Sequence, residues 1–299
     1  MKKILVVGSI NMDLVISTSR LPVLGETIVG DGFETIPGGK GANQAVACAK
    51  LGGNVLFHGA VGNDAYANVL TKALTDVNID ISNVVTTDTN SGVAVITVCD
   101  GNNHIILDGG ANQAFTPDKI NADIFKDINI LILQFEIPTE SVLFAAKTAK
   151  TNGATVILNP APIKEFDAQL LKYVDIIIPN ESEAELLTGK KIDSVEHAKE
   201  ALPELLNSGV KTAIITLGSN GCLYNDGEDL IHVPAKKITP VDTTAAGDTF
   251  IGALSVCLSD GLSLDESIKF AVKASALTCT RKGASISIPS KQEVLDFNC

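Results

Sequence analysis

The chain lacks the features that define several large classes of protein. It contains no CxxC pair, and its six cysteines lie singly in apolar stretches, which argues against a disulfide framework or a zinc site. No apolar run approaches the roughly 20 residues of a membrane span. Acidic residues outnumber basic ones by 35 to 23, and a net negative chain repels phosphate backbones and anionic lipids. We therefore expect a cytoplasmic protein with reduced thiols and with neither nucleic acid nor membrane as a partner.

Several nucleotide-binding and catalytic signatures are missing as well. The pattern GxxxxGK[ST] is absent, and no GxGxxG follows the first apolar run, so P-loop NTPases and ordinary Rossmann dehydrogenases lose support. The four histidines are far apart and form no HExxH, which disfavours a histidine metal site. There is no GxSxG, so a serine hydrolase of that type is unsupported.

What is present is enough for one large core. The chain has 299 residues, of which 45% are hydrophobic and 19% are charged, so we expect a single folded domain over residues 1–299 rather than disorder. The N-terminal segment KILVVG (3–8) could suggest a signal peptide, but its apolar run is short and Asp13 follows soon after. A buried first strand is the better interpretation of this segment.

Strand-like and helix-like segments alternate along most of the chain. Short apolar runs typical of strands buried on both faces occur at 3–8, 129–133, 154–159, 175–180 and 212–218. Between and around them lie helical patterns at 41–52, 64–77, 139–153, 181–189 and 194–209. The alternation predicts an α/β fold with a mostly parallel sheet covered by helices on both sides. From Asp248 to about Thr280 we expect mainly helix, followed by an extended C-terminal segment.

Two stretches depart from this alternation. Residues 13–39 and 91–112 alternate apolar and polar positions around turns that contain Gly or Asn, a pattern typical of antiparallel strands. They predict a small separate sheet or lid.

Polar and glycine-rich segments follow five of the predicted strands. Because ligands bind beyond the carboxyl ends of parallel strands, these segments should share one site. Its candidate members are Gly8, Asn11, Asp13, Glu136, Asn180, Glu183, Gly218 and Gly221.

A second candidate is the segment PGGKGANQAVACAKLGG at 37–53. Consecutive glycines before an alanine-rich helix allow a ligand to approach the backbone closely. Lys40 supplies a positive charge, and Asn43 supplies an amide that can donate and accept hydrogen bonds. A glycine-rich turn with a solvent-exposed lysine is the simpler alternative.

The third candidate is PVDTTAAGDTFIGA at 240–253, where a loop becomes a helix. The free amides and the dipole of a helix N-terminus bind anions, and Ala245, Ala246 and Gly247 leave those amides accessible. Asp248 would then lie beside a phosphoryl group and could accept a proton from an attacking hydroxyl. A plain helix N-cap is the alternative for Asp248, but it does not explain the small residues before it.

These segments resemble known motifs. GGKGANQAVACAKLGG and DTTAAGDTFIGA are similar to the two motif regions of the ribokinase (PfkB) family of carbohydrate kinases. GSINMD, LNPAP, PNESEAE, ITLGSNG and TRKGA stand in the expected order, so the resemblance covers almost the whole chain. It implies a three-layer α/β/α fold with a β lid, and ATP-dependent phosphorylation of the ribose 5-hydroxyl.

The resemblance also implies roles for particular residues. Asp248 would be the catalytic base, and the amides of Ala245, Ala246, Gly247 and Asp248 would form an anion hole. Sugar-binding residues would be Asn11, Asp13, Gly39, Lys40, Asn43, Glu136 and Asp248, and the nucleotide site would use Asn180, Thr216, Gly218 and Gly221. Glu183 would help to arrange Mg²⁺ and its waters.

The resemblance further implies activation by a monovalent cation, usually K⁺, and a homodimer formed through the lid. The expected cation site lies near Asp242, Thr244, Thr278, Arg281, Gly283 and Ser287. Two positions depart from the usual pattern, with Asn220 in place of arginine and Ser285 in place of glutamine. The residues leave open a kinase for deoxyribose, another pentose or a nucleoside, and a sugar-binding sensor without catalysis.

Overall fold

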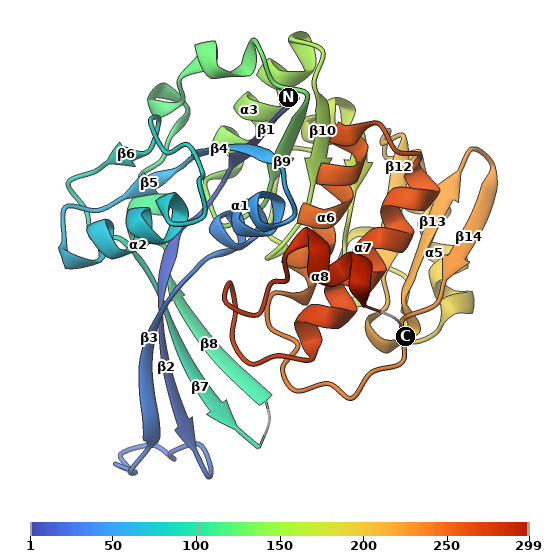
Figure 1. The fold of residues 1–299 in the computed structure, drawn as a ribbon. Helices are drawn as coiled ribbons and strands as arrows, with labels where there is room; N and C mark the ends of the chain where they lie inside the picture. The colour runs from blue at the N-terminus through green and yellow to red at the C-terminus, as the bar shows by residue number, and fades with distance from the viewer. Residues whose placement is uncertain (1, 101, 298–299) are drawn as a thin grey trace.

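The computed structural model describes residues 2–100 and 102–297. Its centre is an eight-stranded sheet in the order β14-β13-β12-β11-β10-β9-β1-β4 (Figure 1). All pairs from β12 to β4 are parallel, and β12–β13 and β13–β14 are antiparallel. The strands are β1 Lys3–Val7, β4 Asn54–His58, β9 Ile130–Leu133, β10 Thr155–Leu158, β11 Ile176–Ile177, β12 Thr212–Thr216, β13 Cys222–Asp226 and β14 Asp229–Val233. The predicted mostly parallel sheet is confirmed.

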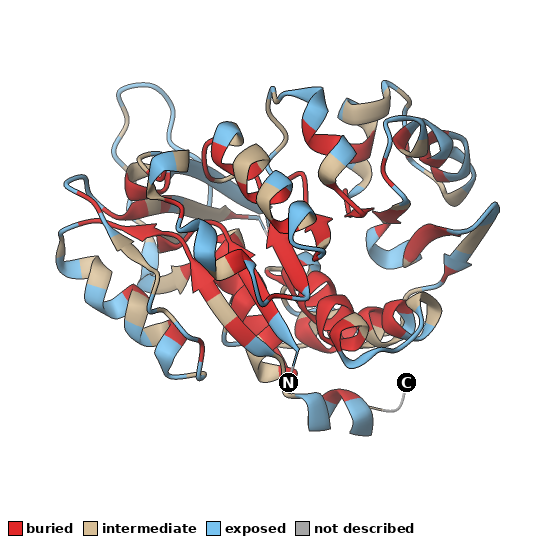
Figure 2. Cartoon of the chain, turned by 90° about the horizontal axis from the view of Figure 1, so that it is seen from above, coloured by how far each residue is buried: buried red, intermediate tan, exposed pale blue. Residues whose placement is uncertain are grey.

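Helices cover both faces of this sheet. Alternate side chains of β1 enter different cores: Ile4 and Val6 pack with the helices of one face, and Leu5 and Val7 with those of the other. The first face carries α1 Lys40–Lys50, α2 Ala65–Thr75, α6 Ala246–Asp260, α7 Leu264–Cys279 and α8 Lys291–Asp296. The second carries α3 Thr139–Thr151, α4 Glu181–Thr188 and α5 Val195–Asn207. Figure 2 shows the buried residues gathered in the strands and in the helix surfaces that face them.

Short 3₁₀ helices complete the connections between these elements. They are η1 Gly110–Asn112, η2 Pro117–Lys119, η3 Ala122–Phe125, η4 Ala168–Tyr173 and η5 Gly218–Asn220. A two-stranded pair, β5 Ala60–Val61 with β6 Val85–Thr86, lies beside them.

A second, four-stranded sheet projects from the main body (Figure 1). Its order is β3-β2-β7-β8, with β2 Asn11–Thr18, β3 Asp31–Gly38, β7 Gly92–Cys99 and β8 Asn102–Asp108. The outer pairs are antiparallel, whereas β2 and β7 pair in parallel at the centre. β2 and β7 are parallel because each is the first strand of its antiparallel pair, and each begins at the main body and runs outward.

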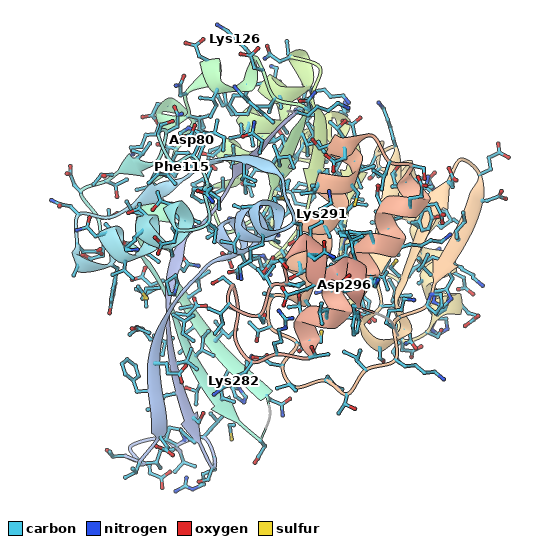
Figure 3. The ribbon with its side chains drawn as sticks, in the orientation of Figure 1. Asp80, Phe115, Lys126, Lys282, Lys291 and Asp296 are labelled. Carbon is cyan, nitrogen blue, oxygen red and sulfur yellow. The ribbon has the colours of Figure 1, made fainter. Side chains whose placement is uncertain are left out.

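The C-terminal third differs from the sequence-based expectation in two places. The expected helical stretch is divided between α6 and α7, because Gly261 ends α6 in a left-handed conformation and Ser263 caps α7. The expectation of an extended end was incomplete, since α8 forms there (Figure 3 labels Lys291 and Asp296). A reciprocal capping box between Ser290 and Glu293 starts this helix.

The hairpin β13–β14 was not predicted. Its turn carries Gly227 with a φ of 62°, and its two strands add an antiparallel edge to the parallel sheet. Within residues 2–100 and 102–297, no helix combines the length and the apolar character needed to cross a membrane.

Candidate active site

The start of α1 is locked against the loop that follows β1. Gly39 caps the helix with a φ of 93°, and a Cβ there would lie 2.8 Å from the backbone nitrogen of Asn11. A Cβ on Gly41 would lie 2.6 Å from the nitrogen of Ser9. The glycines of this motif are therefore required by close backbone packing, which brings Lys40 next to Asn11.

Glu136 follows β9 in the sequence and links several parts of this region through hydrogen bonds. Its Oε2 accepts hydrogen bonds from the Ser9 hydroxyl at 2.5 Å, from Asn11 Nδ2 at 3.3 Å and from the backbone nitrogen of Lys40 at 3.1 Å. One carboxylate oxygen thus joins the segment after β9 to residues 9–11 and to the start of α1. Ser9 was not among the predicted site residues.

Asn112 is a further unpredicted member. It is buried and pairs with both backbone groups of Ile10, at 3.0 and 3.1 Å, and its Nδ2 donates to Asn11 Oδ1 at 2.7 Å. These bonds fix the orientation of the Asn11 amide. No pattern in the sequence links Asn112 to Asn11, which is 101 positions away.

Asp248 lies at the third position of α6 and is buried. Its Oδ1 accepts from Gln44 Nε2 at 2.9 Å, and its Oδ2 accepts from Asn43 Nδ2 at 3.3 Å. Asn43 Oδ1 is buried with no hydrogen-bond partner among the described residues. Because a buried acceptor without a partner is costly, Asn43 is suited to receive a hydrogen bond from a ligand. Gln44 was missed by the sequence analysis.

The N-terminus of α6 is open. Its N-cap is Ala245, in a left-handed conformation with φ 60° and with no side-chain cap, so the N-cap alternative for Asp248 is wrong. The amide of Ala246 donates to Thr243 O at 3.2 Å, but those of Gly247 and Asp248 have no acceptor within the described part of the chain. A Cβ on Gly247 would meet no heavy atom within 4 Å. The helix therefore presents two free amides to open space, as an anion site does.

Carboxylates dominate the electrostatics of the site. Burial, together with the charges of Glu136 and Asp248, raises the pKa of Asp13 to about 7. Burial alone would lower the pKa of Lys40, but the carboxylates of Asp248, Glu136 and Glu183 outweigh it and raise that pKa. Lys40 thus stays charged among acidic groups and supplies a positive charge for an anion.

Three of the predicted nucleotide-binding residues, Asn180, Thr216 and Gly218, lie at or just after the ends of β11 and β12. The fourth, Gly221, directly precedes β13. Asn180 forms a β-bridge with Thr216, and Gly218 lies beside Glu181, whose Oε1 would be 3.7 Å from a Cβ at that glycine. Gly221 has a different reason for being glycine, because a Cβ there would lie 2.0 Å from the backbone oxygen of Val233.

Glu183 and Asn180 form a reciprocal cap of α4. Glu183 Oε2 accepts from the Asn180 nitrogen at 2.9 Å, and Asn180 Oδ1 accepts from the Glu183 nitrogen at 2.9 Å. Burial raises the pKa of Glu183, and the charges of Asp248 and Glu181 add to the rise. This buried carboxylate lies close to the charges of Asp248 and Glu181, an acidic environment that favours a nearby cation.

Three of the residues predicted to bind a monovalent cation come together. Asp242 Oδ1 accepts from the nitrogen and hydroxyl of Thr244 at 2.9 and 2.7 Å, and its Oδ2 accepts from the Gly283 nitrogen at 2.9 Å. These bonds join the loop before α6 to the loop after α7.

The side chains of the other three residues in that prediction point elsewhere. Thr278 Oγ1 lies 3.0 Å from Thr249 Oγ1, Arg281 Nη2 donates to Glu293 Oε1 at 2.7 Å, and the Ser287 hydroxyl donates to Ala284 O at 2.7 Å.

Comparison with known proteins agrees with this geometry. The model of the pfkB family carbohydrate kinases matches residues 1–291. A ribokinase of Lactococcus lactis is 42% identical over 98% of this chain and 96% of its own length. A deoxyribokinase of Salmonella typhi is 36% identical over 98% of each chain.

A solved structure extends the likeness to three dimensions. The ribokinase of Arabidopsis thaliana, in complex with ribose and ATP, has a TM-score of 0.93 and 35% identity over 99% of both chains. The family model and these relatives each span nearly the whole sequence, so the likeness is not confined to the motifs. The chain belongs to the pfkB family of carbohydrate kinases.

Proposed function

We propose that this enzyme transfers the γ-phosphoryl group of ATP to the 5-hydroxyl of D-ribose. The observation that carries the proposal is the position of Asp248, whose carboxylate lies at the open N-terminus of α6 next to the unpartnered Oδ1 of Asn43. The relatives named ribokinase and the neighbour with bound ribose and ATP support this substrate pair.

In the proposed reaction, Asp248 accepts the proton of the ribose hydroxyl as its oxygen attacks the γ-phosphorus. The new O–P bond forms while the bond from the γ-phosphorus to ADP breaks. The free amides of Gly247 and Asp248, with the dipole of α6, stabilise the charge on the phosphoryl oxygens.

The sugar would lie between these groups and the residues around Glu136. Asp13, Glu136 and Asn43 supply acceptors for several hydroxyls, and Lys40 and Asn11 supply donors. A site built from many such groups rejects an analogue that lacks a hydroxyl, because a buried polar group is then left unpaired. Gly39 keeps the backbone close to Asn11.

The test is a coupled ADP-release assay with ribose, deoxyribose, fructose and adenosine. We expect the highest kcat/KM with ribose. Preference for deoxyribose, as the name of the Salmonella relative would suggest, would keep the phosphoryl-transfer site and overturn the sugar assignment. Binding of sugar without turnover on any of the four would favour the sensor.

The elevated pKa of Asp13 predicts a pH effect on sugar use. As an ionised carboxylate Asp13 accepts hydrogen bonds from ribose hydroxyls, and protonation removes part of that capacity. We therefore expect kcat/KM for ribose to fall up to about ten-fold per unit as the pH drops below about 7. Steady-state kinetics at saturating ATP would measure this, and Asp13→Asn should have a low kcat/KM without that limb. A wild-type kcat/KM that is flat through this range would contradict the prediction.

The site offers few carboxylate ligands for Mg²⁺, which is compatible with an ion held mainly by water and phosphate. No three Asp, Glu, His or Cys side chains within the described residues are grouped to hold a metal ion, and Mg²⁺ commonly binds through few carboxylates, waters and substrate phosphates. Glu183 would hold waters of such an ion. When bound with ATP, the ion would neutralise charge on the phosphates.

We also propose that K⁺ activates the enzyme through the loop held by Asp242. Hydroxyl, carboxylate and carbonyl oxygens are hard donors that fit an alkali cation, and the loop leads directly into Ala245 and the free amides. Replacing K⁺ with Na⁺ should lower kcat while the protein stays folded. Equal kcat in the two salts would remove this role.

We further propose that the four-stranded sheet acts as a lid and as the interface of a homodimer. Phe33 on the edge strand β3 and Ile105 and Ile106 on the opposite edge strand β8 are exposed, and exposed apolar side chains on unpaired sheet edges favour association. Analytical ultracentrifugation would test the dimer, and a monomer at all concentrations would overturn it. Closure over the sugar would exclude water and limit wasteful hydrolysis of ATP.

A further inference from the structure

Asp248 is connected by hydrogen bonds to three buried amide side chains. The proposed reaction does not use them. Gln44 belongs to α1, Gln134 follows β9, and Asn159 follows β10. The two glutamines are fully buried and Asn159 is nearly so. Burying amides is unfavourable unless they are hydrogen-bonded, so their connections are informative.

The three amides are linked by hydrogen bonds, and the carboxylate of Asp248 fixes which end of the Gln44 amide donates and which accepts. An ionised carboxylate only accepts hydrogen bonds, so Gln44 Nε2 must face Asp248, to whose Oδ1 it donates at 2.9 Å. Gln44 Oε1 then points away and accepts from Gln134 Nε2 at 2.6 Å. Gln44 Nε2 also donates to Asn159 Oδ1 at 3.2 Å, and Asn159 Nδ2 donates to Ile178 O at 3.0 Å.

The two oxygens of Asp248 are held unequally. Oδ1 is anchored at 2.9 Å by Gln44, whose amide is itself held by the ends of two strands. Oδ2 has the longer contact of 3.3 Å, from Asn43. We propose that Gln44 is a positioning residue for phosphoryl transfer: it pins Oδ1 of Asp248 and so leaves Oδ2 to receive the proton of the sugar hydroxyl.

This inference rests on the proposed function, in which Asp248 is the base. In the reaction the sugar O–H bond breaks, its proton moves to Oδ2, and its electron pair forms the bond to phosphorus. Fixing the acceptor before the reaction matters, because a displacement of about 1 Å in a reacting group costs on the order of 10²-fold in rate.

A purely stabilising role explains the chain of amides less well. Gln134 Oε1 is buried with no partner among the described residues, and an apolar core of the same shape would avoid that cost. The hydrogen-bonded amides leave one buried acceptor, Gln134 Oε1, without a partner, but they hold a donor, Gln44 Nε2, in place toward Asp248. Such an arrangement is expected of a functional site.

The experiment compares Gln44→Met with Gln44→Glu. The first keeps the length of the side chain and removes the donor, so we expect kcat to fall about 10–100-fold with KM for ribose within about two-fold of wild type. The second places a carboxyl beside Asp248, where burial and like charge raise its pKa. Once protonated, that carboxyl can donate to Asp248, so kcat relative to wild type should be higher at about pH 6 than at about pH 8.5.

Charged groups that face Asp248 from other elements are Lys40, Glu183 and Asp13, and Glu136 acts on both Asp13 and Lys40. All four are present in wild type and in both variants, so the ratio of kcat values largely removes their contribution. A merely structural role of Gln44 would not lower kcat of the folded Gln44→Met enzyme while leaving KM for ribose unchanged.

Asn225 provides the matched control. It is a buried amide in β13 that accepts from the Ala213 nitrogen at 2.8 Å and donates to Lys211 O at 3.1 Å. Asn225→Leu should lower the melting temperature and leave kcat of the folded enzyme unchanged. A wild-type kcat in Gln44→Met, or equal ratios at both pH values in Gln44→Glu, would overturn the inference.

Two further measurements separate the possible failures. If Gln44→Met does not fold, Gln134→Met tests the same hydrogen-bonded amides, because Gln134 holds Gln44 in place. In this variant kcat should fall by up to about ten-fold. An unchanged kcat would overturn the inference. Near-normal turnover by Asp248→Asn would instead overturn the proposed base itself. Loss of turnover in Asp248→Asn together with wild-type kinetics in Gln44→Met would overturn the role of Gln44 alone.

Discussion

Asp248→Asn is expected to lower kcat by roughly 10²–10⁴-fold, the usual contribution of a positioned general base. The amide has nearly the shape of the carboxylate and can still accept from Gln44, which donates to the native Oδ1 at 2.9 Å. It cannot take up the proton of the sugar hydroxyl. Steady-state ADP release would measure kcat, and isothermal titration calorimetry would show ribose binding close to that of wild type.

Asp260→Asn is the control on the same helix. Asp260 is the last residue of α6, is exposed, and pairs with Lys291 at 3.1 Å. Exposed ion pairs contribute little to stability, so this variant should keep normal kcat and fold. If Asp248→Asn also retained near-normal kcat, the base would have to be another group, and the open helix end would serve binding alone.

Gly247→Val is expected to reduce kcat/KM for ATP by on the order of 10²-fold, the effect of losing one donor to a developing charge. A Cβ at this position meets no protein atom within 4 Å, so the branched side chain fits the fold. It would occupy the space in which a phosphate must approach the free amides of Gly247 and Asp248. Melting temperature should change little, whereas ATP kinetics should change strongly.

Gly252→Ala should show the opposite behaviour. A Cβ on Gly252 would lie 2.4 Å from the Cβ of Ala47, where α6 crosses α1. Overpacking of this kind costs about 1–3 kcal/mol in the free energy of unfolding, and the folded fraction should keep most of its activity. If Gly247→Val were as destabilising as Gly252→Ala, or left ATP kinetics unchanged, the open anion site would be contradicted.

The sequence alone was sufficient to predict the α/β class and most of the strands and helices of the main body. Buried parallel strands need continuous apolar runs and surface helices need polar faces, so segments such as 129–133 and 139–153 predict their own structure. The regular glycines of GGKGAN likewise indicated a close approach of backbone, although the partner turned out to be the Ser9 loop as well as any ligand. Local capping boxes such as Ser290 with Glu293 were readable but were overlooked.

The composition of the site depended on tertiary structure. Asp248 and Gln44 are 204 positions apart, and Gln44 and Gln134 are 90 apart. Hydrophobic periodicity reports which face of a segment is buried, but it does not report which distant side chain lies opposite. For the same reason the parallel pairing of β2 with β7 could not be predicted, because their local patterns fit either direction.

The sequence by itself therefore determined the α/β class, the rim of the sheet that carries the site, and the residues whose motifs are local. Only the tertiary structure decided that Asn43 has an unpartnered oxygen, that Asn112 orients Asn11, and that Gln44 holds one oxygen of Asp248. The physical reason is that strand and helix formation follow from short-range periodicity. The hydrogen bonds of a buried polar network are instead set by which strand ends and helix starts the whole fold brings together.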